Sequence, residues 1–185
     1  MRSTLASVAR SVYQLLGNFS SKLQSPFLLA IRLYWGWQFV QSGWGKLHNI
    51  GHVTEFFTSL NIPFPHVNAI AVSNLEFFGG ILLILGLASK LTGLALTGNM
   101  LVAYITADRE ALVSIFSDPA KFYAADPYTF LFASVILLVF GAGAISADAL
   151  IARLANKPVT KARTPWPTNV SAMVEPPAEK VALAR

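Results

Sequence analysis

Long apolar runs alternate with short polar segments along this chain. Four runs have roughly the length of a membrane crossing, and they occupy residues 27–47, 68–88, 91–107 and 128–151. A helix needs about 20 mostly apolar residues to cross the hydrocarbon core, and peptide groups inside that core must be satisfied within a helix. The third run is the shortest, so it is expected to gain a turn from its flanking residues. The pattern predicts an all-α membrane protein, a four-transmembrane-helix bundle that runs up, down, up and down.

Three regions follow from this pattern. Residues 26–153 are predicted to form the transmembrane domain, and Pro26 is expected to open its first helix because proline lacks the N–H that a first turn leaves unpaired. Residues 1–25 place apolar side chains at helical spacing, which predicts an amphipathic arm on the membrane surface. Residues 154–185 are rich in proline, which predicts a disordered tail.

The two longer links between predicted spans carry weaker helical patterns. Residues 53–60 predict a short interfacial helix that ends at the Pro63-Phe64-Pro65 turn. The link at 109–127 is expected to contain similar short helical structure.

Composition supports the membrane assignment. The chain is 54% hydrophobic and only 12% charged, whereas soluble domains carry about 25% charged residues. The net charge of +5 raises the question of nucleic acid. No cluster of basic residues is interleaved with aromatic residues on a soluble face, so nucleic acid is excluded as a partner and membrane lipids are expected instead.

The distribution of basic residues predicts the orientation, because lysine and arginine concentrate on the cytoplasmic side. One predicted side carries Arg2, Arg10, Lys22, Lys90, Arg153, Lys157, Lys161 and Arg163. The other side carries only Lys46, Arg109 and Lys121, with several acidic residues beside them. Both termini are therefore predicted to be cytoplasmic.

The absence of cysteine restricts the chemistry. The sequence contains none, which excludes disulfides, cysteine-ligated metal and a dithiol relay within this chain. A redox role would then depend on a cofactor, a bound quinone or a partner subunit.

Charged residues inside the predicted spans are costly to insert, so we expect them to face the bundle interior with partners. Arg32 and Asp148 lie at similar predicted depths near the cytoplasmic side. An Arg32–Asp148 ion pair that joins the first and fourth spans is the simplest arrangement, and such a pair would fix the helix register.

Glu76 is the deepest carboxylate and the main candidate for function. Gln38 and Asn99 lie within about one helical turn of its level, and Lys46 can extend either outward or down towards it. Glu76 is predicted to act as a proton carrier or as a polar anchor for a bound head group. Glycines on the same helical stripes leave room for close helix contact or for a ligand.

Two other patterns, a group of histidines and a group of tryptophans, are not interpreted as functional sites. His48, His52 and His66 lie near Glu55, but a wet loop with a glycine between two of the histidines does not predict a metal site. Trp35 and Trp37 are expected to serve as packed or lipid-facing bulk rather than as a stacking wall for a quinone ring.

An ordered set of motifs resembles the DoxX family of small four-span bacterial membrane proteins, from about Phe27 to Arg153. The set is Arg32-x3-Gly36-x2-Phe39-x3-Gly43-x2-Lys46, Phe57 followed by Pro63-Phe64-Pro65, Glu76-x2-Gly79-Gly80 with Leu85-Gly86, and Gly141-Ala142-Gly143-Ala144-Ile145-Ser146-Ala147-Asp148. The resemblance implies a bacterial cytoplasmic (inner) membrane location. It also implies a subunit of an oxidoreductase system such as a thiosulfate:quinone oxidoreductase. Other similar proteins are components of redox-protection complexes or assembly chaperones.

Three hypotheses follow. The first is an oxidoreductase subunit with a quinone as cofactor or substrate, bound by Arg32, Gln38, Lys46, Glu76, Asn99 and Asp148, with partner subunits supplying electrons. The second is a non-enzymatic membrane scaffold or assembly factor whose polar cluster only locks the bundle. The third is a small-molecule carrier, for which a homo-oligomer is expected.

Overall fold

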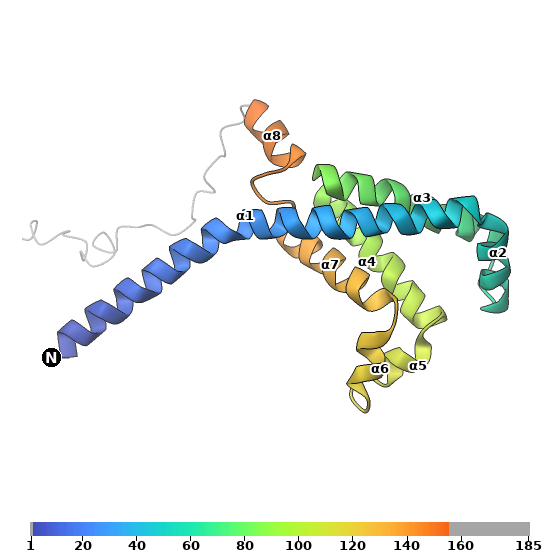
Figure 1. Cartoon of the computed structure of the whole chain (residues 1–185), viewed down its shortest axis with the longest axis horizontal. Helices are drawn as coiled ribbons and strands as arrows, with labels where there is room; N and C mark the ends of the chain where they lie inside the picture. Colours follow the sequence, from blue (N-terminus) through green and yellow to red (C-terminus); the bar gives the residue numbers. More distant parts are fainter. Residues whose placement is uncertain (1, 156–185) are drawn as a thin grey trace, which may run out of the picture.

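The computed structural model describes the backbone of residues 2–155 and the side chains of residues 19–20 and 22–155. Every regular element in this part of the chain is an α-helix (Figure 1). In chain order the helices are α1 (Arg2–His48), α2 (Ile50–Ser59), α3 (Pro65–Leu85), α4 (Ser89–Thr106), α5 (Arg109–Val113), α6 (Pro119–Ala124), α7 (Pro127–Phe140) and α8 (Ala147–Leu154). The proline-rich tail predicted at the C-terminus lies almost wholly outside the described residues.

The bundle is built from two helix pairs. The helix α1 packs along α3, and α4 packs along α7, with α3–α4 and α1–α7 contacts joining the pairs. Figure 1 shows the two pairs crossing at an angle and diverging towards the ends that carry α2 and the α5–α6 hairpin. The core between them contains Phe39, Leu83, Leu96 and Leu137, all fully buried.

Glycines set the closest approach between α1 and α3. A Cβ on Gly80 would lie 2.6 Å from the carbonyl oxygen of Gly36, and one on Gly43 would overlap the backbone of Phe77. Small residues at such positions allow helix backbones to touch, which is typical of packing inside membranes.

The outer faces of the helices are apolar. Trp37, Phe78, Leu94 and Phe132 are each more than half exposed, on α1, α3, α4 and α7. A soluble domain seldom exposes apolar side chains on every face of its bundle, whereas a lipid-facing bundle does. By length and composition, α3 is the one helix within residues 2–155 that could cross a membrane unaided, and the apolar α7 is shorter.

The structure confirms the short helical segments expected in both links, as α2, α5 and α6. The third run gains Ser89 and Lys90 at its start, as α4 begins at Ser89, but α4 ends at Thr106 and has only 18 residues, so the run does not gain the full turn expected.

The predicted helix start at Pro26 is wrong. Helix α1 runs unbroken for 47 residues, and Pro26 lies inside it. A proline within a helix removes one backbone hydrogen bond and bends the helix without always ending it. Figure 1 accordingly shows α1 changing direction where its N-terminal arm meets the bundle.

The fourth predicted run is also not one helix. Helix α7 ends at Phe140, and the chain turns through Gly141 and Gly143, with φ of 72° and 76°. Such left-handed backbone suits glycine and ends the helix. Ser146 then begins α8 by accepting a hydrogen bond from the backbone N–H of Ala149. The segment between the two helices is called the glycine turn below (residues 141–146).

Candidate functional site

Glu76 lies on the inner face of α3 and is almost completely buried, with 2% of its surface exposed. The ammonium nitrogen of Lys46 lies 2.5 Å from both of its carboxylate oxygens. The Ser42 hydroxyl donates to Oε2 at 2.8 Å, and the Asn99 amide donates to Oε1 at 3.1 Å. The carboxylate is thus held by side chains from α1 and α4. These four residues are called the Glu76 cluster.

Local sequence explains how the Glu76 cluster forms. Ser42 and Lys46 are separated by one helical turn, so both project from the same face of α1. Gly43 lies between them and brings α1 against the backbone of Phe77, the residue after Glu76. The close contact places the Lys46 ammonium group within reach of Glu76, so Lys46 turns inward rather than outward.

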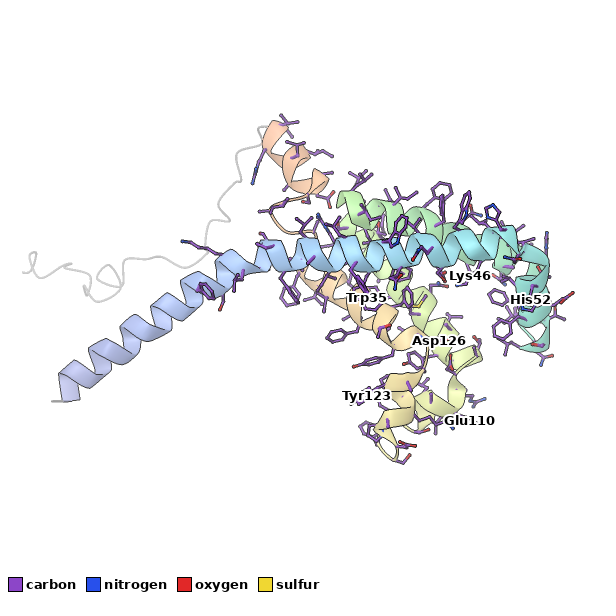
Figure 2. The ribbon with its side chains drawn as sticks, viewed as in Figure 1. Trp35, Lys46, His52, Glu110, Tyr123 and Asp126 are labelled. Atoms are coloured by element: carbon purple, nitrogen blue, oxygen red, sulfur yellow. The ribbon has the colours of Figure 1, made fainter. Side chains whose placement is uncertain are left out.

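All four residues of the Glu76 cluster line a large cavity of about 1000 Å³. Figure 2 shows Lys46 on α1, His52 on α2 and Asp126 at the start of α7 around this space. Most of its wall is apolar, with contributions from Phe39, Val53, Phe56, Phe57, Leu60, Ile62, Val72, Met100, Val102 and Phe130. The polar part of the wall includes Ser42, Lys46, Glu76, Asn99, Asp108 and Asp126.

The cavity combines a largely apolar wall with the hydrogen-bonding groups of the Glu76 cluster. Lys46 has three N–H groups and directs two contacts at Glu76, and Asn99 uses one amide N–H on Glu76. Each of these side chains therefore keeps a donor for another acceptor. Such a site can hold a molecule that has a neutral oxygen acceptor at one end and an apolar body.

Arg32 and Asp148 do not form the expected ion pair. Arg32 is fully buried and donates to the backbone carbonyls of Ala142 and Ile145, both at 2.8 Å. In the part of the chain that the structure describes, the ion pairs are Lys46–Glu76 and Lys121–Glu110. The prediction fails because the glycine turn exposes carbonyls that no helix satisfies, and these occupy the guanidinium group instead.

Asp148 has a different partner. Its two carboxylate oxygens accept hydrogen bonds from the backbone N–H groups of Ala88 and Ser89, at 2.7 and 3.0 Å. These are the first N–H groups of α4, where a negative charge is favourable. Arg32 thus fastens the glycine turn to α1, and Asp148 fastens α8 to the start of α4, separately from each other and from Glu76.

The remaining predicted binding residue, Gln38, is half-buried on α1 and makes no side-chain hydrogen bond within the described residues. The structure thus unites Lys46, Glu76 and Asn99 and leaves Arg32, Gln38 and Asp148 outside the cluster. Ser42 was missed by sequence reasoning. Its spacing of one turn from Lys46 is the signal that would have found it.

The histidines are scattered. His48 contacts the carbonyl of Trp44, His66 lies near the Thr54 hydroxyl, and His52 lines the cavity. No group of three metal-binding side chains comes together within the described residues.

Comparison with known proteins gives one match. Residues 27–109 match the DoxX family model, which is consistent with a DoxX assignment and supports a membrane protein. The match includes the Glu76 cluster and ends before the glycine turn. No curated protein and no solved structure matches the chain.

Proposed function

With the DoxX match as the premise, we propose that this protein is a membrane subunit of an oxidoreductase system that binds a quinone or a similar small amphipathic molecule. The polar head lies against the Glu76 cluster, and the apolar remainder lies along the cavity. The observation that carries the proposal is a buried, fully hydrogen-bonded carboxylate in the wall of a cavity of about 1000 Å³.

The dimensions and lining of the cavity support a ligand of this class. Ligand pockets usually enclose about 300–1000 Å³ and have apolar walls with a few placed polar groups. A purely structural ion pair needs no such space beside it. The volume next to the Lys46–Glu76 pair therefore favours a binding role over a helix lock alone.

The hydrogen-bonding groups match a quinone head. Lys46 and Asn99 each keep an N–H that can donate to a carbonyl oxygen. Quinone reduction takes up protons together with electrons, and a carboxylate–ammonium pair in hydrogen-bond reach can supply or accept them. Glu76 is the proposed proton carrier, and a partner subunit supplies the electrons.

The proposed topology places four helices, α1, α3, α4 and α7, across the bacterial cytoplasmic membrane with both termini inside. Lys90, in the first turn of α4, and Arg153, in α8, lie at the end of the bundle that carries the glycine turn, and a cytoplasmic position for that end agrees with their charge. The cavity between α2 and the α6–α7 link then opens towards the outer half of the membrane.

The proposal is tested on the purified full-length protein. Quinones and lipids that co-purify are identified by mass spectrometry, and a short-chain quinone is titrated while tryptophan fluorescence is followed. We expect retained quinone and saturable quenching, with affinity reduced by roughly tenfold in Glu76→Gln because a charge-assisted interaction is lost.

The matched control is Glu55→Gln, which changes an exposed carboxylate on α2 outside the cavity wall. The control should bind as the unaltered protein does. Absence of retained quinone, together with equal titrations for the unaltered protein and Glu76→Gln, would remove the proposal.

The second candidate is a non-enzymatic scaffold or assembly factor. The observation that favours it is that Arg32 anchors the glycine turn and Asp148 anchors α8, contacts that serve the fold and lie outside the cavity. On this alternative, Glu76→Gln changes stability but no ligand affinity.

A further inference from the structure

The charged groups that line the large cavity are unbalanced. Lys46 is the single lysine or arginine among its lining residues, and its ammonium group is already bound to Glu76. Two further carboxylates, Asp108 and Asp126, line the same cavity towards its α5 and α7 side. His52 is the other titratable side chain that can be cationic there. With Lys46 and Glu76 offsetting each other, two negative charges remain.

The carboxylates of Asp108 and Asp126 do not stabilise the helices that follow them. Each residue precedes a helix, but neither side chain forms a capping hydrogen bond. Burial and the charge of Asp126 raise the pKa of Asp108, in agreement with two carboxylates that face the same cavity.

The nearest basic side chains do not change this balance. Arg109 and Lys121 line an adjoining, smaller cavity of about 370 Å³, which shares Asp108 with the large one, but neither forms an ion pair with Asp108. Lys121 is occupied there by Glu110, at 2.8 Å. Neither residue belongs to the wall of the large cavity.

We infer that the large cavity selects its amphipathic ligand by head-group charge, accepting neutral and cationic heads and rejecting anionic ones. The inference rests on the proposed function, since it specifies the ligand class of the same cavity. Three features of the cavity support it. The walls are apolar, Lys46 and Asn99 each keep an N–H that can donate to a neutral oxygen, and two carboxylates have no cationic partner.

The physical reason is electrostatic. Like charges repel strongly where low-dielectric walls limit screening. An anionic head would meet Asp108 and Asp126, and at Lys46 it would meet an ammonium charge that Glu76 already offsets. A neutral carbonyl or hydroxyl oxygen can use the spare donors and leave the ion pair intact. The cavity would thereby exclude fatty acids and anionic phospholipids, the abundant competitors in a bacterial membrane.

The test uses full-length protein in nanodiscs of zwitterionic phosphatidylcholine. A photoreactive alkyl amide, which is neutral, labels the cavity, and mass spectrometry locates the labelled peptides. An alkylamine and an alkylsulfonate of the same chain length then compete with the label. We expect the amine to compete at least as well as the unlabelled amide and the sulfonate to be weaker by roughly tenfold.

Two variants identify the groups responsible. The double variant Asp108→Asn/Asp126→Asn should bring the sulfonate close to the amide in competition, and asparagine is well tolerated at positions that precede helices. Glu110→Gln removes an exposed carboxylate outside the large cavity and should leave the selectivity unchanged.

The outcomes separate the two proposals. If the label is saturable but the sulfonate competes as well as the amine, charge selection is wrong and the binding cavity stands. An unchanged selectivity in the double variant also overturns charge selection. If no saturable label appears in the cavity, both charge selection and the proposed function fail.

Discussion

The Lys46 ammonium nitrogen lies 2.5 Å from each carboxylate oxygen of Glu76, and the two partners differ greatly in burial. The Glu76 side chain is 2% exposed, whereas that of Lys46 is 33% exposed. The pair therefore joins an enclosed anion to a cation that reaches the cavity. This asymmetry has consequences for stability as well as for binding.

The two single substitutions in the pair should have unequal effects. Lys46→Met leaves a buried carboxylate without its cation and should lower the free energy of unfolding by about 3–5 kcal/mol. Glu76→Gln leaves a lysine that can extend to water and should cost about 1–2 kcal/mol. Denaturant unfolding in detergent measures both. A larger loss for Glu76→Gln would contradict this description of the pair.

Substitution of Gly43 should separate α1 from α3. The added methyl group of Gly43→Ala would overlap the backbone of Phe77, so the helices must shift, at a cost of about 1–3 kcal/mol. Gly45→Ala is the control, because a Cβ there meets no atom within 4 Å. Thermal unfolding in detergent should show a lower Tm for Gly43→Ala and no decrease for Gly45→Ala.

Arg32 and Asp148 should each stabilise the fold without pairing with each other. Arg32→Met leaves two carbonyls of the glycine turn unpaired and should cost about 2–4 kcal/mol. Asp148→Ala removes the acceptor from the start of α4 and should cost about 1–2 kcal/mol. The charge-swapped variant Arg32→Asp/Asp148→Arg should be no more stable than either single substitution. Rescue by the swap would instead indicate a direct ion pair.

Asp108 should make the stability depend on pH. Its pKa is raised above the ordinary value of 3.8, first by burial and then by Asp126. A carboxyl group with a raised folded-state pKa contributes stability that is complete below its ordinary pKa and is lost as pH rises through the folded-state value. Asp108→Asn stays neutral, so its Tm should fall less than that of the unaltered protein as pH rises above about 4.

Glu110 should affect the pH dependence of stability in the opposite direction to Asp108, and the same pH series measures both. The hydrogen bond and charge of Lys121 lower its pKa below the ordinary value of 4.5. Its contribution is present above that value and is lost as pH falls through the folded-state pKa. Because the pair is exposed, Glu110→Gln should change the Tm only slightly, and chiefly above the ordinary pKa.

The Asp108 prediction has its own contradicting outcome. If the Tm declines with rising pH equally in Asp108→Asn and in the unaltered protein, Asp108 is not the source of the decline.

The sequence predicted the features that depend on local spacing. Apolar run lengths located α3 and α4 closely, and the glycine stripe on α1 anticipated the close contact at Gly43. Depth along the helices brought Asn99 and Gln38 to the level of Glu76, but only Asn99 contacts it, and the direction of Lys46 was left open. The shared helical face of Ser42 and Lys46 was available in the sequence and was not used.

The features that were missed depend on tertiary partners. Gly141 and Gly143 are as compatible with a packed transmembrane helix as with a turn, and only the backbone angles distinguish the two. From the sequence alone, Arg32 was expected to pair with the nearest opposite charge. The true acceptors of Arg32 are backbone carbonyls that are free only because α7 ends before them, and the sequence did not reveal that end. Sequence depth alone could not separate this anchor from the Glu76 cluster.

The central claim is that a neutral head group accepts hydrogen bonds from Lys46 and Asn99 beside Glu76. Infrared difference spectroscopy of a quinone isotopically labelled at its carbonyls tests it most directly. We expect a carbonyl band shifted to lower frequency in the unaltered protein and in Glu55→Gln, with the shift reduced in Asn99→Leu and Lys46→Met. A bound quinone whose carbonyl bands match those in lipid, or whose shift survives both substitutions, would contradict the claim.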